Sequence, residues 1–298
     1  MICQITTQKA CLFHNCLATW RGNRYSIGVH IVSIINQKGG VGKTTSVANI
    51  GAAMAAAGHR VLLVDLDPQA HLSISFDRMP EPGEPSVYTL LMGQNSFIDV
   101  MQPTQAEGLH IAPTNLDLTG AESELAAEIG REGILGLALH ALSKTPQAPD
   151  VVLLDCPPSL GTLSLNALVA SNSVIVPLQA EFFALQGMAQ LLDVLERVKQ
   201  RLNPGLELLG VLIGMFSKQR NLSREVLQEL RAHFGDLVFP TQVRVNVRLA
   251  EAPSHGQTIF EYAPDSTAAE QFTEIAAELA KRIGLNSNDT EQQPENIV

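Results

Sequence analysis

Residues 37–45 read Gln-Lys-Gly-Gly-Val-Gly-Lys-Thr-Thr and stand between an apolar run at 31–36 and an alanine-rich stretch. The glycines let the backbone curl so that its N–H groups face one centre, and the N-terminus of a following helix adds partial positive charge. Lys43 can reach β- and γ-phosphates there, and the Thr44 hydroxyl can ligate Mg²⁺. The stretch therefore predicts a phosphate-binding loop. Its expected ligand-binding residues are Lys38, Gly39, Gly40, Val41, Gly42, Lys43, Thr44 and Thr45.

From residue 31 onward, short β-branched runs alternate with helical stretches. Most of these runs are apolar at every position, as expected for strands that helices cover on both faces. We expect strands at 31–36, 61–65, 109–112, 151–155, 173–178, 208–215 and 237–243. We expect helices at 43–57, 121–142, 162–171, 185–202, 222–234 and 266–283. The alternation predicts an α/β fold with a doubly wound, mostly parallel sheet flanked by helices.

Composition bounds the class of protein. The 298 residues are 45% hydrophobic, which supports a sizeable core, but no apolar run is long enough for a transmembrane helix. We expect one domain over 30–284, a disordered acidic tail over 285–298, and a disordered extension or mis-assigned start over 1–29. Three of the four cysteines lie in that first segment, which excludes a disulfide framework and suits a reducing cytosol. The possible metal ligands there match no common zinc spacing: Cys3, Cys11, His14 and Cys16.

One position of the loop departs from the common phosphate-loop pattern. That pattern, G-x-x-x-x-G-K-[ST], has glycine where this chain has Gln37, and Lys38 follows as a second lysine. Two ammonium groups close to one phosphate repel each other unless more negative charge lies nearby. Lys38 therefore favours a second phosphate centre, as in a face-to-face dimer in which it would reach the nucleotide of the other subunit.

The run Lys-Gly-Gly-Val-Gly-Lys-Thr-Thr at 38–45 resembles the deviant Walker A motif of the ParA, Soj and MinD ATPases. The similarity covers about residues 30–284 and includes VDLDPQ at 64–69, LDCPPS at 154–159, QAEFFAL at 179–185 and NVRLAEAPS at 246–254. The last two runs are similar to the Soj-like chromosome-partitioning branch. The resemblance implies a P-loop NTPase fold, ATP and Mg²⁺ as cofactors, an ATP-dependent homodimer, and hydrolysis of ATP to ADP and phosphate.

Three aspartates end predicted strands, at the sheet edge where open α/β sheets bind ligands. Asp155 follows the apolar run 151–154, which is the Walker B arrangement of a carboxylate that holds Mg²⁺ directly or through water. By resemblance, Asp67 orients the attacking water, and Asp65 is a structural or metal-linked carboxylate behind it. The expected catalytic residues are Lys38, Lys43 and Asp67, and the expected metal ligands are Thr44, Asp65 and Asp155.

A basic segment lies late in an otherwise acidic chain. The net charge is −10, but residues 197–248 hold nine Lys or Arg and four Asp or Glu. DNA binding is therefore compatible with the acidic net charge. The sequence contains no helix-turn-helix or zinc-finger signature, so base-specific recognition is not predicted. Resemblance to Soj-like proteins implies non-specific DNA binding by the ATP-bound dimer. The candidate DNA contacts are Lys218, Arg220, Arg244 and Arg248. These charges are shifted in position relative to the motifs that related proteins usually carry. Asn246 is the candidate adenine contact.

The resemblance implies a switch that drives chromosome or plasmid partition in the cytoplasm, associated with the nucleoid when ATP is bound. No arginine finger is evident in cis, so we expect slow hydrolysis that a ParB-like partner stimulates. Alternatives on this fold are positioning of a non-DNA cargo, a MinD-like cell-division regulator, and an ATP-dependent ligase or synthetase. An iron–sulfur carrier would need paired cysteines, whereas only Cys156 lies in the body. The tail is acidic and broken by Pro294, which weighs against a stable membrane anchor.

Overall fold

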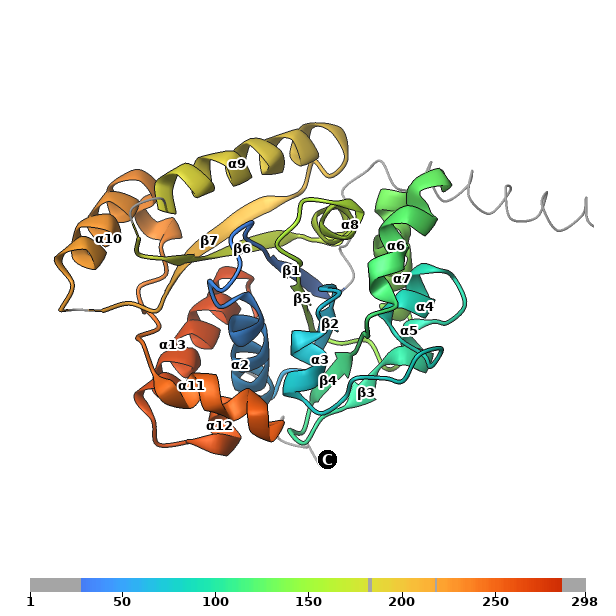
Figure 1. Cartoon of the computed structure of the whole chain (residues 1–298), viewed down its shortest axis with the longest axis horizontal. Coiled ribbons are helices and arrows are strands. Elements are labelled where there is room, and N and C mark those ends of the chain that lie inside the picture. The colour runs from blue at the N-terminus through green and yellow to red at the C-terminus, as the bar shows by residue number, and fades with distance from the viewer. Residues whose placement is uncertain (1–27, 182–183, 218, 286–298) are drawn as a thin grey trace, which may run out of the picture.

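The computed structural model describes residues 28–181, 184–217 and 219–285. Its centre is a seven-stranded sheet with the order β3-β4-β2-β5-β1-β6-β7 (Figure 1). All neighbouring strands are parallel except β3 and β4. The strands are β1 (His30–Ile34), β2 (Val61–Asp65), β3 (Gln102–Pro103), β4 (Leu109–Ala112), β5 (Val151–Asp155), β6 (Ser173–Gln179) and β7 (Glu207–Gly214).

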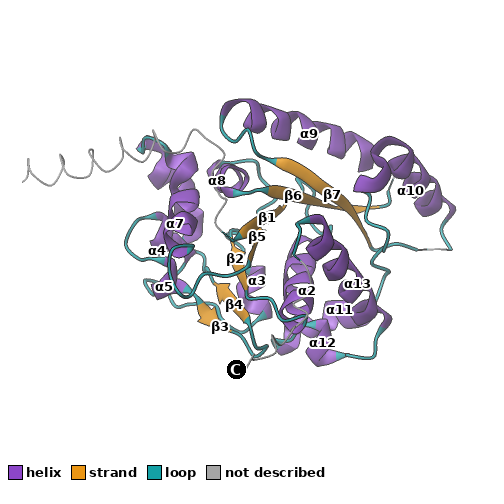
Figure 2. Cartoon of the chain, turned by 180° about the vertical axis from the view of Figure 1, so that it is seen from behind, coloured by secondary structure: helices purple, strands orange, loops and turns teal. Residues whose placement is uncertain are grey.

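Helices cover both faces of this sheet, which places most strand residues in the core (Figures 1 and 2). One face carries α2 (Lys43–Ala56), α3 (His71–Ser75), α11 (Val247–Glu251), α12 (Ile259–Tyr262) and α13 (Thr267–Arg282). The other carries α4 (Val87–Leu91), α5 (Phe97–Val100), α6 (Leu118–Glu124), α7 (Ile134–Leu142), α8 (Thr162–Ala170), α9 (Ala184–Arg201) and α10 (Asn221–Phe234). The doubly wound α/β prediction is confirmed.

The parallel register of the strands brings the candidate site residues to the carboxyl edge of the sheet. The carboxyl ends of β1, β2 and β5 are adjacent, and Asp65 stands in register with Asp155. The loop at 37–45 joins β1 to α2 at that same edge. Residues that are far apart in the chain therefore surround the N-terminus of α2, as expected for ligand sites of open α/β sheets.

Two predicted elements were wrong. The segment 237–243 is not a strand: within it, Val238 forms an isolated bridge with Val211, and a second isolated bridge, Phe216 with Arg244, lies just after it. Pro240, which has no N–H to donate, interrupts the run. The predicted helix 121–142 is also broken, because Gly130 adopts φ 74° and separates α6 from α7. The short elements α3, α4, α5, α11, α12 and β3 were not predicted.

The C-terminal helix α13 is fastened to the edge strand β7 by one side chain. The Arg282 guanidinium donates to the Leu209 carbonyl at 2.9 Å and to the Asp236 carbonyl at 2.8 Å. It also lies over the Phe239 ring, 4.3 Å from its centroid. Gly210 has no side chain, which leaves the space that this packing occupies.

Candidate functional site

The loop at 37–45 has the backbone of an anion cradle. Gly40 and Gly42 adopt φ of 72° and 89°, in the left-handed region that favours glycine. Gly42 precedes α2, whose first N–H groups have no partner within the helix. The Lys43 side chain is buried and its Nζ points back to the Lys38 carbonyl, at 3.5 Å. Lys43 therefore lies within the curl of the loop, where a phosphate would be held.

Two side chains outside the loop fix its shape. Asn36 Oδ1 accepts from the Lys38 N–H at 2.9 Å, and Asn36 Nδ2 donates to the Pro177 carbonyl at 2.7 Å. Gln179 Nε2, at the end of β6, donates to the Gly40 carbonyl at 2.8 Å. No motif in the sequence predicts these contacts. The register of β1 with β6, which brings positions 36 and 177–179 to one edge, is what creates them.

Lys38 is placed differently from Lys43. Its side chain is 54% exposed, and its Nζ forms an ion pair with Glu181 and a 3.4 Å hydrogen bond with Gln179 Oε1. The second lysine thus lies at the mouth of the loop. Within one subunit its ammonium group is held by a carboxylate.

Asp155 is a buried carboxylate without hydrogen-bond partners. Among the described residues, neither of its oxygens has a partner of normal hydrogen-bond geometry, although both are buried. Burial, followed by the nearby Asp65 charge, raises the pKa of Asp155 well above its ordinary value, while the Thr44 hydroxyl and the Lys43 ammonium act in the opposite direction. A buried carboxylate normally finds such partners. Its oxygens and the Thr44 hydroxyl are ligands of the kind that Mg²⁺ prefers, so these residues fit a magnesium ion.

Asp65 has its oxygens occupied already. Oδ2 accepts from the Ser73 N–H at 2.8 Å and the Ser73 hydroxyl at 2.7 Å, and Oδ1 accepts from the Asp67 N–H at 3.2 Å. Burial raises the pKa of Asp65 to about 7, although these three hydrogen bonds lower it. The Ser73 hydroxyl also accepts from the Thr114 N–H at 2.9 Å. Of the two roles open to Asp65, these contacts favour the structural one, because they fix α3 and the loop that carries Asp67.

Asp67 lies in that loop beside the other two aspartates. Its Oδ1 accepts from the Gln69 N–H at 3.0 Å, and the side chain is 9% exposed. It contributes to the raised pKa of both Asp65 and Asp155. Asp67 is therefore close to Asp155, the carboxylate that fits a magnesium ion best, and is itself less suited to hold that ion. This is the position required of a residue that orients water.

Asp155→Asn tests the magnesium assignment. We expect it to raise the free energy of unfolding without nucleotide by about 1 kcal/mol, because it removes a buried carboxylate whose oxygens accept no well-formed hydrogen bond in the described part of the chain. The same variant should lose the extra stabilisation that Mg²⁺ adds to ADP. Thermal unfolding with ADP, in Mg²⁺ and in EDTA, measures both effects. Equal Mg²⁺-dependent stabilisation in the variant and the parent would contradict this role.

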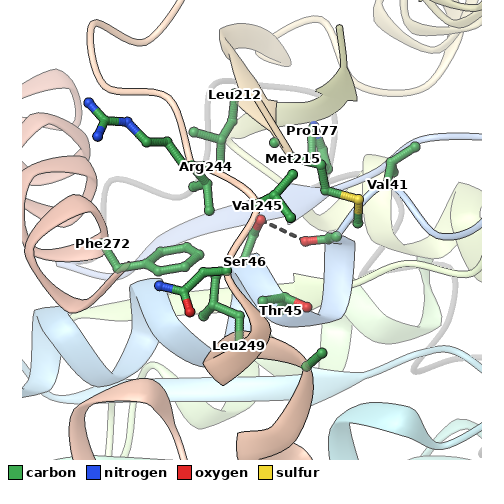
Figure 3. A pocket seen from close by; sticks show the side chains of 15 residues that line it. Val41, Thr45, Ser46, Pro177, Leu212, Met215, Arg244, Val245, Leu249 and Phe272 are labelled. Carbon is green, nitrogen blue, oxygen red and sulfur yellow. Dashed lines mark hydrogen bonds between the residues drawn. The ribbon is translucent and has the colours of Figure 1, made fainter. Parts of the chain in front are cut away.

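A largely apolar pocket opens beside the loop (Figure 3). Its volume is about 240 Å³, and it is lined from α2, the end of β7, the 243–246 segment, α11 and α13. Leu249 and Phe272 lie to one side and Met215 to another (Figure 3). Asn246 lines it as the cap of α11, with Oδ1 accepting from the Arg248 N–H at 2.9 Å. Among the described residues the Asn246 Nδ2 amide makes no hydrogen bond, so it is available to a ligand held in this pocket beside the loop.

The candidate DNA contacts are spread over two helix starts. Arg220 precedes α10, Arg244 borders the apolar pocket, and Arg248 is on α11. Arg248 pairs with Glu251 at 3.4 Å, and its guanidinium lies 5.9 Å from the Tyr262 ring centroid. Lys218 lies outside the described residues. α10 and α11 cover opposite faces of the sheet, so the candidate contacts are not gathered on one face.

A cysteine-bound cluster and a metal site of several His, Cys, Asp or Glu side chains are two other classes of site. Cys156 is buried, and burial strongly raises the pKa of its thiol, so it is not poised to bind an exposed cluster. Over the described ranges, no group of three His, Cys, Asp or Glu side chains is arranged to hold a metal ion. The Cys3, Cys11, His14 and Cys16 set lies outside those ranges. No helix in the described part of the chain is long and apolar enough to cross a membrane.

Comparison with known proteins adds independent findings. A family model described as an AAA domain matches residues 29–208. The sporulation initiation inhibitor protein Soj of Bacillus subtilis is 44% identical over 84% of this chain and 98% of its own length. The chromosome partitioning protein ParA of Myxococcus xanthus is 39% identical over 97% of this chain and 99% of its own length. The latter alignment covers 289 of the 298 residues, so it extends into residues 1–29.

A solved structure gives the same fold with ligands. The crystal structure of cobyrinic acid a,c-diamide synthase from Mycobacterium smegmatis, with a bound ATP analogue and magnesium, has a TM-score of 0.74 and 38% identity. It covers 86% of this chain and 96% of that one. The phosphate loop, the aspartates around it and the apolar pocket thus occur in a fold that is known to hold a magnesium nucleotide.

Proposed function

This chain belongs to the family of ParA and Soj ATPases, with ATP and Mg²⁺ as its cofactors, and from that premise we propose that it is a nucleotide-gated DNA-partitioning switch. In this proposal ATP closes two subunits face to face, and the dimer holds DNA without sequence preference. A ParB-like partner then stimulates hydrolysis, which releases the DNA. The protein would act in the cytoplasm, on the nucleoid while ATP is bound, in chromosome or plasmid partition.

The placement of Lys38 carries the proposal. Lys43 already occupies the inside of the loop, whereas Lys38 extends from its mouth and is half exposed. A lysine in this position is available to a phosphate that approaches from outside the subunit. Closing two such subunits would bring each Lys38 to the other nucleotide and would replace its pairing with Glu181.

Each of the other site residues has a distinct task in this scheme. The loop backbone and Lys43 hold the β- and γ-phosphates, and Thr44 with Asp155 would hold Mg²⁺, which neutralises phosphate charge when bound. Asp67 orients the attacking water in line with the γ-phosphate. Asp65 keeps the Asp67 loop in place through Ser73. The apolar pocket, with the Asn246 amide at its rim, would take the adenine.

The proposed DNA-binding surface is formed by arginines outside the nucleotide site. Arg220 and Arg248 are exposed, one at the start of α10 and the other on α11. Joining two subunits would double this basic surface, and non-specific affinity rises steeply with the number of phosphate contacts. An ATP-dependent dimer thereby couples nucleotide state to DNA affinity, with no base-specific reading required.

A mobility shift with a long non-specific duplex tests the proposal. Retardation is expected with ATP, not with ADP, and it should persist in Asp67→Ala with ATP. It should be lost in Lys38→Ala and at high salt. Arg248→Ala should lower the slope of log affinity against log salt by about 1. Lys144→Ala, an exposed lysine change outside the basic segment, is the matched control and should change nothing. Absence of binding in every nucleotide state would refute the DNA part.

Three alternative functions are separated by the mobility shift together with assays of ATP turnover and vesicle binding. An ATP-dependent synthase, the activity in the name of the Mycobacterium smegmatis structure, would turn over ATP only with its small-molecule substrate and would not retard DNA. A MinD-like regulator would bind anionic vesicles with ATP. Binding of DNA without any effect of a ParB-like protein would favour positioning of another cargo.

A further inference from the structure

An apolar groove lies on the face opposite to α2. It is lined by the α4–α5 turn, by α5 and by the outer side of α7, and has a volume of about 510 Å³. Ile98 in its wall is 43% exposed, and Leu137, Ala138 and Ala141 of α7 are half-buried or exposed. None of these residues belongs to the nucleotide site or to the basic segment.

The sequence of α7 indicates that this groove is covered. The helix reads Ile-Leu-Gly-Leu-Ala-Leu-His-Ala-Leu, with His140 as its single polar side chain. A helix that is apolar all round is normally buried on every side. Here Leu135, Leu139 and Leu142 face the core, and Ile134 and Ala138 pack against its edge. Leu137 and Ala141, which also line the groove, are apolar without belonging to that core.

We propose that the N-terminal segment of the same chain, residues 1–27, docks in this groove. The segment holds Lys9, Arg21 and Arg24 and no Asp or Glu, together with apolar side chains that include Leu12, Phe13, Leu17 and Trp20. Residues 81–144, which carry the groove, hold nine Asp or Glu and two Lys or Arg. The basic, apolar segment and the acidic part of the chain that carries the apolar groove therefore have complementary charge.

The segment 1–27 joins the fold at a point close to the groove. The His30 N–H donates to the Asp150 carbonyl at 2.9 Å, and Asp150 lies five residues after Thr145, which lines the groove. Five residues span at most about 18 Å, whereas 27 residues reach about 40 Å even as a helix. Val29, the residue next to β1, packs against the same hydrophobic cluster that contains Leu139 and Leu142. The segment leaves the fold close to the end of the groove and is long enough to fill it.

Trp20 is the only tryptophan, so its fluorescence in the full-length chain reports this docking directly. We expect a blue-shifted emission with low accessibility to acrylamide. Ala141→Arg puts a cation into the groove from an exposed position and should not disturb the core. It is expected to shift the emission to that of a water-exposed tryptophan and to speed trypsin cleavage after Arg21 and Arg24 by at least about tenfold, as full undocking would.

The matched control is Ala127→Arg, the same change at an exposed alanine of the same acidic stretch, 81–144, but outside the groove lining. It should leave both the fluorescence and the cleavage rate unchanged. A solvent-like emission in the parent chain, or an unchanged emission in Ala141→Arg, would overturn the proposal. A blue-shifted signal that disappears on dilution, together with the mass of a dimer, would overturn docking within the chain and assign the groove to a second copy.

Discussion

Replacing Asp67 by alanine is expected to lower the ATP turnover rate about 10²-fold or more, the usual size of effect for a residue that positions or activates a reacting water. Nucleotide affinity should change little, because the loop backbone, Lys43 and the magnesium ligands remain. The fold should persist as well, since the Asp67 side chain accepts only the Gln69 N–H among the hydrogen bonds of the described residues. Turnover at saturating ATP and the dissociation constant of ADP measure the two effects separately.

Gln69→Ala is the control for this prediction. Gln69 is exposed in the same loop, and only its backbone N–H contacts Asp67. The variant should therefore retain turnover within a small factor of the parent. A large loss in Gln69→Ala, or normal turnover in Asp67→Ala, would show that the loop rather than the Asp67 carboxylate is responsible.

Gly210→Ala is expected to destabilise the fold by about 2–3 kcal/mol, the cost of overpacking a site that cannot relax. A Cβ at this position would lie 2.6 Å from Phe239 Cε2, 2.6 Å from Arg282 Nη1 and 2.8 Å from the Leu237 carbonyl oxygen. Relief requires that α13 move from β7 or that the backbone at 237 shift. Thermal unfolding should show a fall in Tm of about 5 °C or more.

Gly205→Ala is the matched control, since it makes the same substitution in the turn before the same strand. The nearest atom to an added Cβ there is Asn203 Oδ1 at 3.7 Å, an ordinary contact. Its Tm should stay within about 2 °C of the parent. A similar loss of stability in both variants would show that the Arg282 packing does not cause the effect.

Local patterns predicted the parts of this protein that depend on neighbouring residues. The glycines, Lys43 and Thr44 lie within the single run 37–45. Strands that are apolar on both faces predict a parallel sheet covered by helices. Six of the seven expected strands are present, with ends shifted by a residue or two. The expected roles of the individual site residues remain predictions, although the structure brings the loop and the three aspartates to one edge of the sheet.

What escaped prediction depends on contacts between distant segments. Ser73 bonds to Asp65 and Thr114 at once, a role that no motif around Ser73 indicates. The Phe272 wall of the apolar pocket comes from a helix more than 200 residues after the loop. The segment 237–243 was predicted as a strand because its residues are mainly apolar. Pro240 interrupts it, and Phe239 packs against Arg282, so the segment is a loop that contacts α13.

Both margins of the sheet are closed against further strands. On one side β3 has two residues, runs antiparallel to β4 and contains Pro103, which cannot donate a ladder hydrogen bond. On the other, the non-strand segment after α10 covers β7, with the Phe239 N–H bonded to the Val211 carbonyl and the Val243 N–H to the Ile213 carbonyl. Exposed edges are where proteins grow into aggregates. Chains crowded together at high local concentration would therefore find, in the described sheet, no long exposed edge strand as a template for continuous β-ribbon growth.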